Sequence, residues 1–467
     1  MIFSKITPFN ADIYHPVALY LALRNKYRKT CLLESNDYHS RENSTSFIGL
    51  EPIVEIRLEH NSLYISYQHK DKTVYLNPEI SIIEQLQSIV DEFEFQDKKT
   101  KGNGFFGRFG FEFALLTENK IPKLNSTLEI PDLHLFIFKH IIVIDHFTDN
   151  GYIISNSFQE DDFQYFNPEI ILKHNPYITF PFETTQEEIS DFTDEEFAKI
   201  VIKAKQNCLR GDVFQLVVSN AFSQEYFGDD FNVYRQLRRL NPSPYLFYFD
   251  FETYRLFGSS PEAQLILNNG KAEIHPIAGT VPKTGNTLID NEKIEFLIHD
   301  EKENSEHTML VDLARNDLSK DCENVKIEVL KELQNFSHVI HLVSKVTADF
   351  SEKSNLKLFN NTFPAGTLSG TPKPMALELI SKYEKSTRDY YGGAVGNISP
   401  NGNLNMAIVI RSVLSKNNQL HYRAGAGVVL DSIVENEVNE VHHKLKAVRT
   451  AIKMANENRV LINNKEI

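Results

Sequence analysis

The spacing of apolar residues predicts both strands and helices in the first part of the chain. The run LHLFIFKHIIVI at residues 133–144 is apolar and rich in β-branched side chains, which is typical of a buried strand or strand pair. Between Ser81 and Phe93, apolar residues recur at helical spacing and predict one buried helix face. The chain to about residue 156 therefore mixes strands with helices.

A polar segment with several acids and prolines follows at residues 157–192, and we interpret it as a connection. Thr193 and Glu196 then form the Thr-x-x-Glu pattern of a capping box, which predicts the start of a helix. That helix ends at Gly211, and an apolar strand follows at residues 213–219.

The second unit extends over roughly residues 190–455. Its predicted strands include residues 407–413 and 421–423. Its last helix has an apolar stripe from Val434 to Ile452, with spacings of four and three residues.

Composition narrows the class of protein. A chain of 467 residues, 41% of them hydrophobic, fits two or three ordinary domains or one large fused one. The net charge of −14 argues against nucleic acid or an anionic membrane as the main partner. We find neither a signal peptide nor an apolar run that could span a bilayer, and the three cysteines have no metal-ligand spacing. The sequence predicts a cytoplasmic protein.

Two pairs of glutamates stand out among the charged residues. Glu303 and Glu306, and again Glu437 and Glu440, are three residues apart on predicted helices, so each pair shares one helix face. Mg²⁺ prefers carboxylate and other oxygen ligands, and two facing pairs could hold it against an anionic substrate. Each pair alone is equally typical of a solvated helix surface, and both interpretations stay open at this point.

Other polar features are compatible with a small anionic ligand. Residues 363–374 (FPAGTLSGTPKP) and Gly425–Gly427 form two glycine-rich turns that could approach an anion closely. Arg411 ends a predicted strand and could bind a carboxylate, or form a surface ion pair. His341 could act in acid–base chemistry, or could be structural. P-loop, Rossmann and Gly-x-Ser-x-Gly patterns are absent from the sequence.

Several longer strings, taken together, resemble the chorismate-binding enzymes, and they occur in the order found in that family. Two earlier strings, LLES at 32–35 and NPSPYLF at 241–247, resemble the anthranilate synthase component I group in particular. The family strings are PIAGT (276–280), EHTMLVDLARNDL (306–318), HVIHLVSKV (338–346), FPAGTLSGTPKP (363–374), YYGGAVGNISPNGN (390–403), IVIRS (408–412) and YRAGAGVVLDS (422–432).

The resemblance implies an α+β fold with large, mostly antiparallel β-sheets sandwiched by helices. Residues 1–190 would interleave with the core and hold a tryptophan regulatory site, and residues 191–467 would form the chorismate-binding catalytic region. It also implies Mg²⁺ as cofactor, with Glu306, Glu440 and Glu437 at the metal.

The resemblance further assigns roles to single residues. His341, Thr367 and Glu303 match catalytic or supporting positions, the first two near the departing 4-hydroxyl group. The tryptophan inhibitor would contact Glu34, Ser35, Pro244, Tyr245 and Leu246. The substrate contacts implied by the resemblance are Gly279, Thr280, Tyr391, Arg411, Gly425, Ala426, Gly427 and Lys444.

Two positions discriminate between members of the family. Aminodeoxychorismate synthases of the common type carry a nucleophilic lysine where this chain has Ala278. Isochorismate and salicylate synthases carry a lysine base where it has Gln215. The resemblance thus implies an anthranilate synthase subunit that converts chorismate and ammonia to anthranilate and pyruvate, the first step of tryptophan biosynthesis, with feedback inhibition by tryptophan.

Ammonia would come from a separate glutamine amidotransferase subunit, because Cys31, Cys208 and Cys322 all lack the Gly-rich context of a glutaminase nucleophile. The alternatives are component I of aminodeoxychorismate synthase and, from another class, a catalytically inactive tryptophan sensor.

Overall fold

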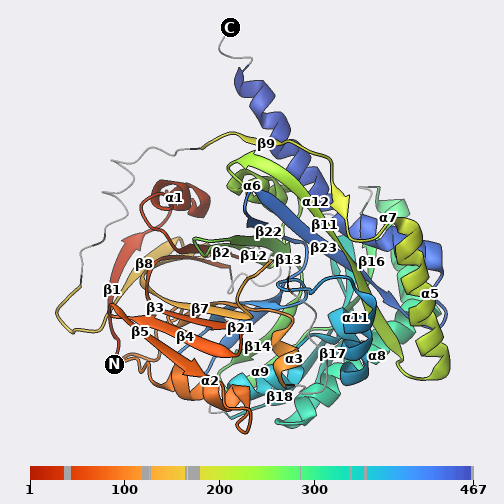
Figure 1. The fold of residues 1–467 in the computed structure, drawn as a ribbon, viewed down its shortest axis with the longest axis horizontal. Helices are drawn as coiled ribbons and strands as arrows, with labels where there is room; N and C mark the ends of the chain where they lie inside the picture. Colours follow the sequence, from red (N-terminus) through yellow and green to blue (C-terminus); the bar gives the residue numbers. More distant parts are fainter. Residues whose placement is uncertain are drawn as a thin grey trace.

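Antiparallel strands run through the protein as one hydrogen-bonded network, with helices on the outside (Figure 1). The computed structural model describes residues 1–35, 44–117, 126, 128–163, 166, 179–283, 286–335, 339–351 and 355–463, and for 278, 280, 282, 301, 302, 335, 339 and 458–463 the backbone alone. The helices are α1 (Pro16–Leu23), α2 (Ile82–Asp91), α3 (Phe113–Thr117), α5 (Asp194–Arg210), α6 (Phe231–Leu240), α7 (Thr287–His299), α8 (Glu301–Ser319), α9 (Asn355–Thr362), α10 (Gly366–Ser369), α11 (Lys373–Tyr383) and α12 (Val434–Asn463).

The strands come from every part of the chain. They are β1 (Phe3–Asn10), β2 (Thr30–Glu34), β3 (Thr45–Glu59), β4 (Ser62–Tyr67), β5 (Lys70–Tyr75), β6 (Phe105–Phe109), β7 (Leu133–Asp145), β8 (Asn150–Ser157), β9 (Phe182–Thr184), β10 (Ile189–Ser190), β11 (Gln215–Gly228), β12 (Tyr245–Asp250), β13 (Arg255–Ser260), β14 (Ala263–Asn268), β15 (Lys271–Ile274), β16 (Ile277–Pro282), β17 (Glu323–Asn335), β18 (Val339–Asp349), β19 (Gly370–Thr371), β20 (Ala394–Ile398), β21 (Leu404–Ile408), β22 (Ser412–Lys416) and β23 (Gln419–Val428).

Strands distant in the sequence lie side by side. β2 pairs with β12, and β6 pairs with β20, both antiparallel. Strands of the first 190 residues are therefore hydrogen-bonded to strands of the remainder. The predicted α+β class, with large antiparallel sheets and flanking helices, is confirmed.

The apolar patterns form the elements that they predict. The run at 133–144 forms β7, and Ser81 caps α2, whose Ile82, Ile83, Leu86 and Ile89 are buried. Thr193 and Glu196 make both hydrogen bonds of the capping box at the start of α5. Gly211 ends this helix in the left-handed conformation, with φ of 80°, which glycine adopts without strain.

Two expectations were wrong in detail, and a third was incomplete. The strand predicted at 407–413 is interrupted, because β21 ends at Ile408, β22 begins at Ser412, and Arg411 between them has a positive φ of 48°. Gly425–Gly427 is not a turn: it lies within β23, paired with Val217–Ser219 of β11. The connection at 157–192 contains β9 and β10, which also pair with β11, whereas 164–165 and 167–178 lie outside the described residues.

Helices cover the faces of the sheet that carry the predicted site residues. α8 packs on β16, β17 and β18, while α12 packs on β23, α5 and α6 (Figure 1). On α12, Val441, Leu445, Val448 and Ile452 are buried, as the apolar stripe predicts. In the described part of the chain, no helix has the length and apolar character needed to cross a membrane.

Candidate active site

Arg411 lies at the centre of the predicted substrate contacts. It follows β21 and precedes β22, and its side chain is close enough to Glu262 and Glu440 to interact with both electrostatically. Burial lowers the pKa of its guanidinium, while the two acids act in the opposite direction. A half-buried guanidinium of this kind is suited to bind a carboxylate with both nitrogens.

Glu262, which the sequence analysis missed, lies beside Arg411 in the turn between β13 and β14. It is 9% exposed, and its Oε1 accepts a hydrogen bond of 3.1 Å from Thr367 Oγ1. Burial raises the pKa of Glu262 to about 7, against the opposing effects of Thr367, Lys444 and Arg411. A carboxyl group with this pKa can hold and release a proton near neutrality. An acid between two apolar strands, in SSPEAQL, was the available signal in the sequence.

The strand β23 brings three further predicted residues to this cluster. Lys444 on α12 donates to the Gly425 carbonyl at 2.9 Å and pairs with Glu440 at 3.3 Å. The Tyr391 hydroxyl is hydrogen-bonded to the Gly425 backbone. A Cβ at Gly425 would lie 2.6 Å from the Val218 carbonyl oxygen, so the close packing of β23 on β11 requires glycine here.

Gln215 lies beside Gly427 across the β11–β23 pair. A Cβ on Gly427 would lie 2.8 Å from Gln215 Nε2, so the glycine leaves room for the amide. Gln215 is buried, and its Oε1 has no hydrogen-bond partner in the part of the chain that is described. Ala426, between the two glycines, is fully buried and belongs to the hydrophobic core.

His341 and Gly279 also belong to this cluster, since His341 lies close enough to Arg411 to interact with it. His341 of β18 is hydrogen-bonded to the Gly279 backbone, and burial, helped by the charge of Arg411, lowers its pKa to about 4. Gly279 has a φ of 69° where β16 bulges against β18, a conformation that favours glycine. Thr280 pairs with His341 through its backbone; the side chains of Thr280 and Ala278 lie outside the described part.

The four acids of the two glutamate pairs lie on two helices that border this cluster. Glu303 on α8 faces Gly279, since its Oε2 lies 3.3 Å from the position of a Cβ there. Glu306 follows one turn later, and on α12 a buried Glu437 precedes Glu440 by one turn. No group of three acidic, histidine or cysteine side chains is already arranged around a metal position within the described residues. The donors are all hard carboxylate oxygens, which fit Mg²⁺ when a ligand oxygen and waters complete the shell.

The predicted tryptophan contacts gather at a second place. Leu246 of β12 lies opposite Glu34 of β2, and Ser35, Pro244 and Tyr245 adjoin them in the sequence. The buried Glu34 carboxylate accepts hydrogen bonds from Tyr234 at 2.6 Å and from Arg238 at 2.9 and 3.0 Å. Neither partner was predicted, because they lie on α6, whose sequence resembles an ordinary amphipathic helix.

Glu34 and Arg238 also influence the pKa values of two nearby histidines. Burial lowers the pKa of both His15 and His146, and Arg238 lowers it further while Glu34 acts to raise it. The environment of Glu34 thus includes an arginine, a tyrosine hydroxyl and, through longer-range electrostatic effects, two imidazoles.

The three cysteines show no sign of an activated nucleophile. Burial raises the pKa of Cys31 and of Cys208, and raises that of Cys322 to about 11. A glutaminase cysteine needs a lowered pKa, because the thiolate is the attacking species.

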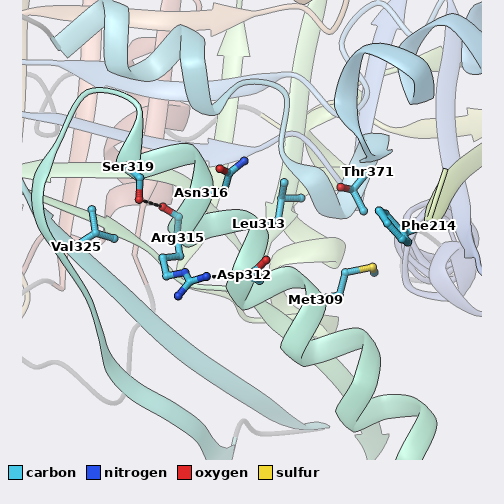
Figure 2. A pocket seen from close by; sticks show the side chains of 9 residues that line it. All are labelled: Phe214, Met309, Asp312, Leu313, Arg315, Asn316, Ser319, Val325 and Thr371. Atoms are coloured by element: carbon cyan, nitrogen blue, oxygen red, sulfur yellow. Dashed lines mark hydrogen bonds and ion pairs between the residues drawn. The ribbon is translucent and has the colours of Figure 1, made fainter. Parts of the chain in front are cut away.

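A cavity of about 690 Å³ lies beside the C-terminal half of α8 (Figure 2). Its wall includes the pair Asp312–Arg315, joined at 2.5 Å, and Leu313, which packs on Gly366 next to Thr367. The lining residues are Phe214, Met309, Asp312, Leu313, Arg315, Asn316, Ser319, Val325 and Thr371. None of them belongs to the predicted site.

Comparison with known proteins gives concordant results. A family model described as chorismate binding enzyme matches residues 29–450. Anthranilate synthase component 1 of Aquifex aeolicus is 33% identical over 477 residues, which cover 97% of this chain and 94% of that protein. The crystal structure of anthranilate synthase component I from Streptococcus pneumoniae TIGR4 is similar with a TM-score of 0.76 and 28% identity, covering 94% of this chain and 98% of that one.

The likeness of fold extends further than the likeness of sequence. The menaquinone-specific isochorismate synthase of Escherichia coli has a TM-score of 0.74 at 18% identity, covering 97% of this chain and 95% of that one.

Proposed function

This chain belongs to the family of chorismate-binding enzymes, and we propose that it is the anthranilate synthase subunit that joins ammonia to chorismate and releases anthranilate and pyruvate. The observation that carries the choice of nucleophile is Gln215. Its uncharged amide lies beside Gly427 at the edge of the cluster, where a lysine base would be needed to activate water. An amide cannot remove a proton from water, but its oxygen can accept a hydrogen bond from ammonia.

Substrate binding would use the cations of the cluster. Chorismate carries two carboxylates, and we assign them to Arg411 and to the surroundings of Lys444, Tyr391 and Gly425. Glu306 and Glu440 would hold Mg²⁺, with Glu303 and Glu437 in support. When bound, this ion would draw electron density from the ring through the ring carboxylate.

Proton transfer would be divided between Glu262 and His341. Ammonia attacks C2, the C4–oxygen bond breaks, and the departing hydroxyl needs a proton to leave as water. Glu262, with its raised pKa of about 7 and its hydrogen bond to Thr367, is the group that holds such a proton at neutral pH. His341 is neutral there, because its pKa is lowered to about 4, so it would accept the C2 proton as the C3–oxygen bond breaks. The departing enolpyruvate would take up a proton, which protonated His341 can return, and leave as pyruvate.

Ammonia would come from a separate amidotransferase subunit. The raised pKa values of all three cysteines support this division of labour, since none of them is poised to attack glutamine. Tryptophan would bind at Glu34, Ser35, Pro244, Tyr245 and Leu246 and inhibit the reaction. The charged surroundings of Glu34 support a ligand that carries both an ammonium and a carboxylate group.

The test uses the purified chain with chorismate, Mg²⁺ and a high concentration of ammonium. We expect fluorescent anthranilate and an equal amount of pyruvate. Glu306→Ala and Glu440→Ala should abolish turnover, whereas Glu435→Ala, an exposed acid on the same helix as Glu440, should not. Glutamine should support the reaction only after the partner subunit is added.

Three results would refute the proposal. Aminodeoxychorismate as the sole product would identify the sibling enzyme, and full activity in a metal chelator would remove Mg²⁺ from the mechanism. Tryptophan binding without any turnover of chorismate would identify an inactive sensor.

A further inference from the structure

The two candidate sites are joined by one row of residues across the sheet. Glu34 on β2 lies opposite Leu246 on β12, and Leu246 lies opposite Ser259 on β13. The Ser259 amide then donates to the Arg411 carbonyl at 3.1 Å. With strands roughly 4.8 Å apart, the backbones of Glu34 and Arg411 are separated by about 14 Å.

Helix α6 makes a second connection between the same two places. Tyr234 and Arg238, one turn apart on α6, both bind the Glu34 carboxylate. Asn241 caps the C-terminal end of this helix, and its backbone N–H donates to the Leu237 carbonyl. The Asn241 Oδ1 in turn accepts a hydrogen bond of 3.4 Å from Arg411 Nη1. One short helix therefore contacts the acid of one site and the cation of the other.

The Asn241 carboxamide is oriented by the residues around it. Its Nδ2 donates to Ser259 Oγ at 3.1 Å and to Ser243 Oγ at 3.3 Å, and the Ser259 hydroxyl donates back to the Asn241 carbonyl. Ser243 and Ser259 are both buried. With both amide hydrogens used in this way, the oxygen is left to face Arg411.

Arg411 needs such an anchor. Its φ of 48° is unfavourable for a residue with a Cβ, so surrounding contacts must maintain it. The guanidinium interacts electrostatically with Glu262 and Glu440, which would compete with an incoming carboxylate. The neutral Asn241 amide can fix the guanidinium without neutralising its charge.

We propose that Asn241 is a positioning residue that holds Arg411 for the substrate carboxylate, and that α6 transmits occupancy of the Glu34 site to it. The inference rests on the proposed function. A ligand ammonium group that takes the Glu34 carboxylate competes with Arg238, which shifts α6 and, with it, Asn241. Two ligands that favour different positions of one helix necessarily weaken each other's binding.

The first experiment separates binding from chemistry. The wild type is assayed with chorismate and ammonium, and failure to produce anthranilate at this stage would refute the proposed function itself. In an active background, Asn241→Ala should raise the KM for chorismate about tenfold, the factor expected for a lost hydrogen bond to a charged group, with kcat changed less than about twofold. Asn232→Ala, an asparagine at the other end of α6 that donates to the Phe180 carbonyl, is the matched control and should leave both constants unchanged.

The second experiment measures the coupling directly. The chain contains no tryptophan, so the fluorescence of added tryptophan reports its binding against a background of tyrosine alone. In the wild type, tryptophan should raise the apparent KM for chorismate. In Asn241→Ala, tryptophan should still bind, but its effect on the KM should largely disappear.

A second variant covers the case in which Asn241→Ala does not fold. Ser259→Ala removes one partner of the Asn241 amide and should change the KM and the coupling in the same direction, by about threefold. A wild-type KM in a folded Asn241→Ala protein would overturn the inference, as would undiminished inhibition by tryptophan. An active wild type that does not respond to tryptophan would overturn the role of α6 while leaving the proposed reaction intact.

Discussion

Two buried glutamates, Glu262 and Glu384, lie in neighbouring regions of the protein and have opposite electrostatic surroundings. Glu384 follows α11 and accepts hydrogen bonds from Ser219, from Arg388 at 2.6 Å and from Arg423 at 2.8 Å. Burial acts to raise its pKa, but Arg388 and Arg423 outweigh it, and the net shift is downward. Glu262 has one hydroxyl partner and two more distant cations, and burial dominates, so its pKa rises to about 7.

The difference shows how one residue type serves two purposes in one fold. Where two arginines saturate a carboxylate, the charge is fixed and the group ties elements together: here β11, β23 and α11. Where a carboxylate is buried with a single hydroxyl, it remains able to exchange a proton. Substitutions at the two acids and at their hydroxyl partners distinguish these two roles.

Replacing Glu384, the acid that pairs with two arginines, should lower the free energy of unfolding the most. Glu384→Gln leaves Arg388 and Arg423 buried beside a neutral amide, and we expect the free energy of unfolding to fall by about 3 to 5 kcal/mol. Urea denaturation followed by circular dichroism measures this loss. A change below about 1 kcal/mol would show that the cluster is not held by its charges.

The same substitution at the other acid should affect catalysis. Glu262→Gln removes the proposed proton donor, and we expect kcat to fall about a hundredfold to a thousandfold. The free energy of unfolding should not fall at neutral pH, because no arginine loses a close ion-pair partner there and the neutral amide avoids the cost of burying an ionised carboxylate. Retained activity in a folded Glu262→Gln protein would show that another residue donates the proton, and His341 would be the next candidate.

The two acids should also respond to pH with opposite sign. Glu262 keeps its proton in the folded protein up to about pH 7, whereas the unfolded chain loses it near its ordinary pKa of 4.5. Stability from this group is therefore present below about pH 4.5 and is lost as pH rises to about 7, by on the order of 3 kcal/mol. For Glu384, whose pKa is lowered, the contribution is present above its ordinary pKa and is lost on acidification.

Urea titrations at several pH values can separate the two contributions. The stability difference between wild type and Glu262→Gln should change between pH 5 and pH 8, while the penalty for Glu384→Gln should shrink only below about pH 4. In the activity assay, kcat/KM for chorismate should decline above about pH 7 as Glu262 loses its proton. A flat alkaline profile would contradict that assignment.

Sequence reasoning found the elements better than it found the environments of their residues. Apolar periodicity and the capping-box pattern are local properties of the sequence. They therefore predicted β7, α2, the start of α5 at Thr193 and the buried stripe of α12. Sequence reasoning placed Gly425–Gly427 in a turn, because small residues fit a tight turn and a closely packed strand equally well.

The missed residues share one reason. Glu262, Tyr234, Arg238 and Asn241 owe their interest to partners that are distant in the sequence and adjacent only after the strands pair. The sequence pattern singled out Arg411 and His341, and the resemblance to a family assigned their roles. Only the folded chain shows that Glu262 is buried close to Arg411, Lys444 and Thr367.

The smallest expected effects come from a matched pair of hydroxyl deletions. Ser219→Ala removes one donor to Glu384, but the Ser219 amide and both arginines remain, so we expect a loss of about 1 kcal/mol in unfolding free energy and no change in the activity–pH profile. Thr367→Val removes the one hydroxyl that hydrogen-bonds Glu262 and favours its ionised form, so the pKa of Glu262 should rise further. The alkaline limb of the kcat/KM profile should then move to higher pH, by less than about one unit, while Ser219→Ala leaves it in place. If both variants moved this limb equally, the two acids would form one coupled system, and the contrast between a fixed charge and a proton donor would have to be abandoned.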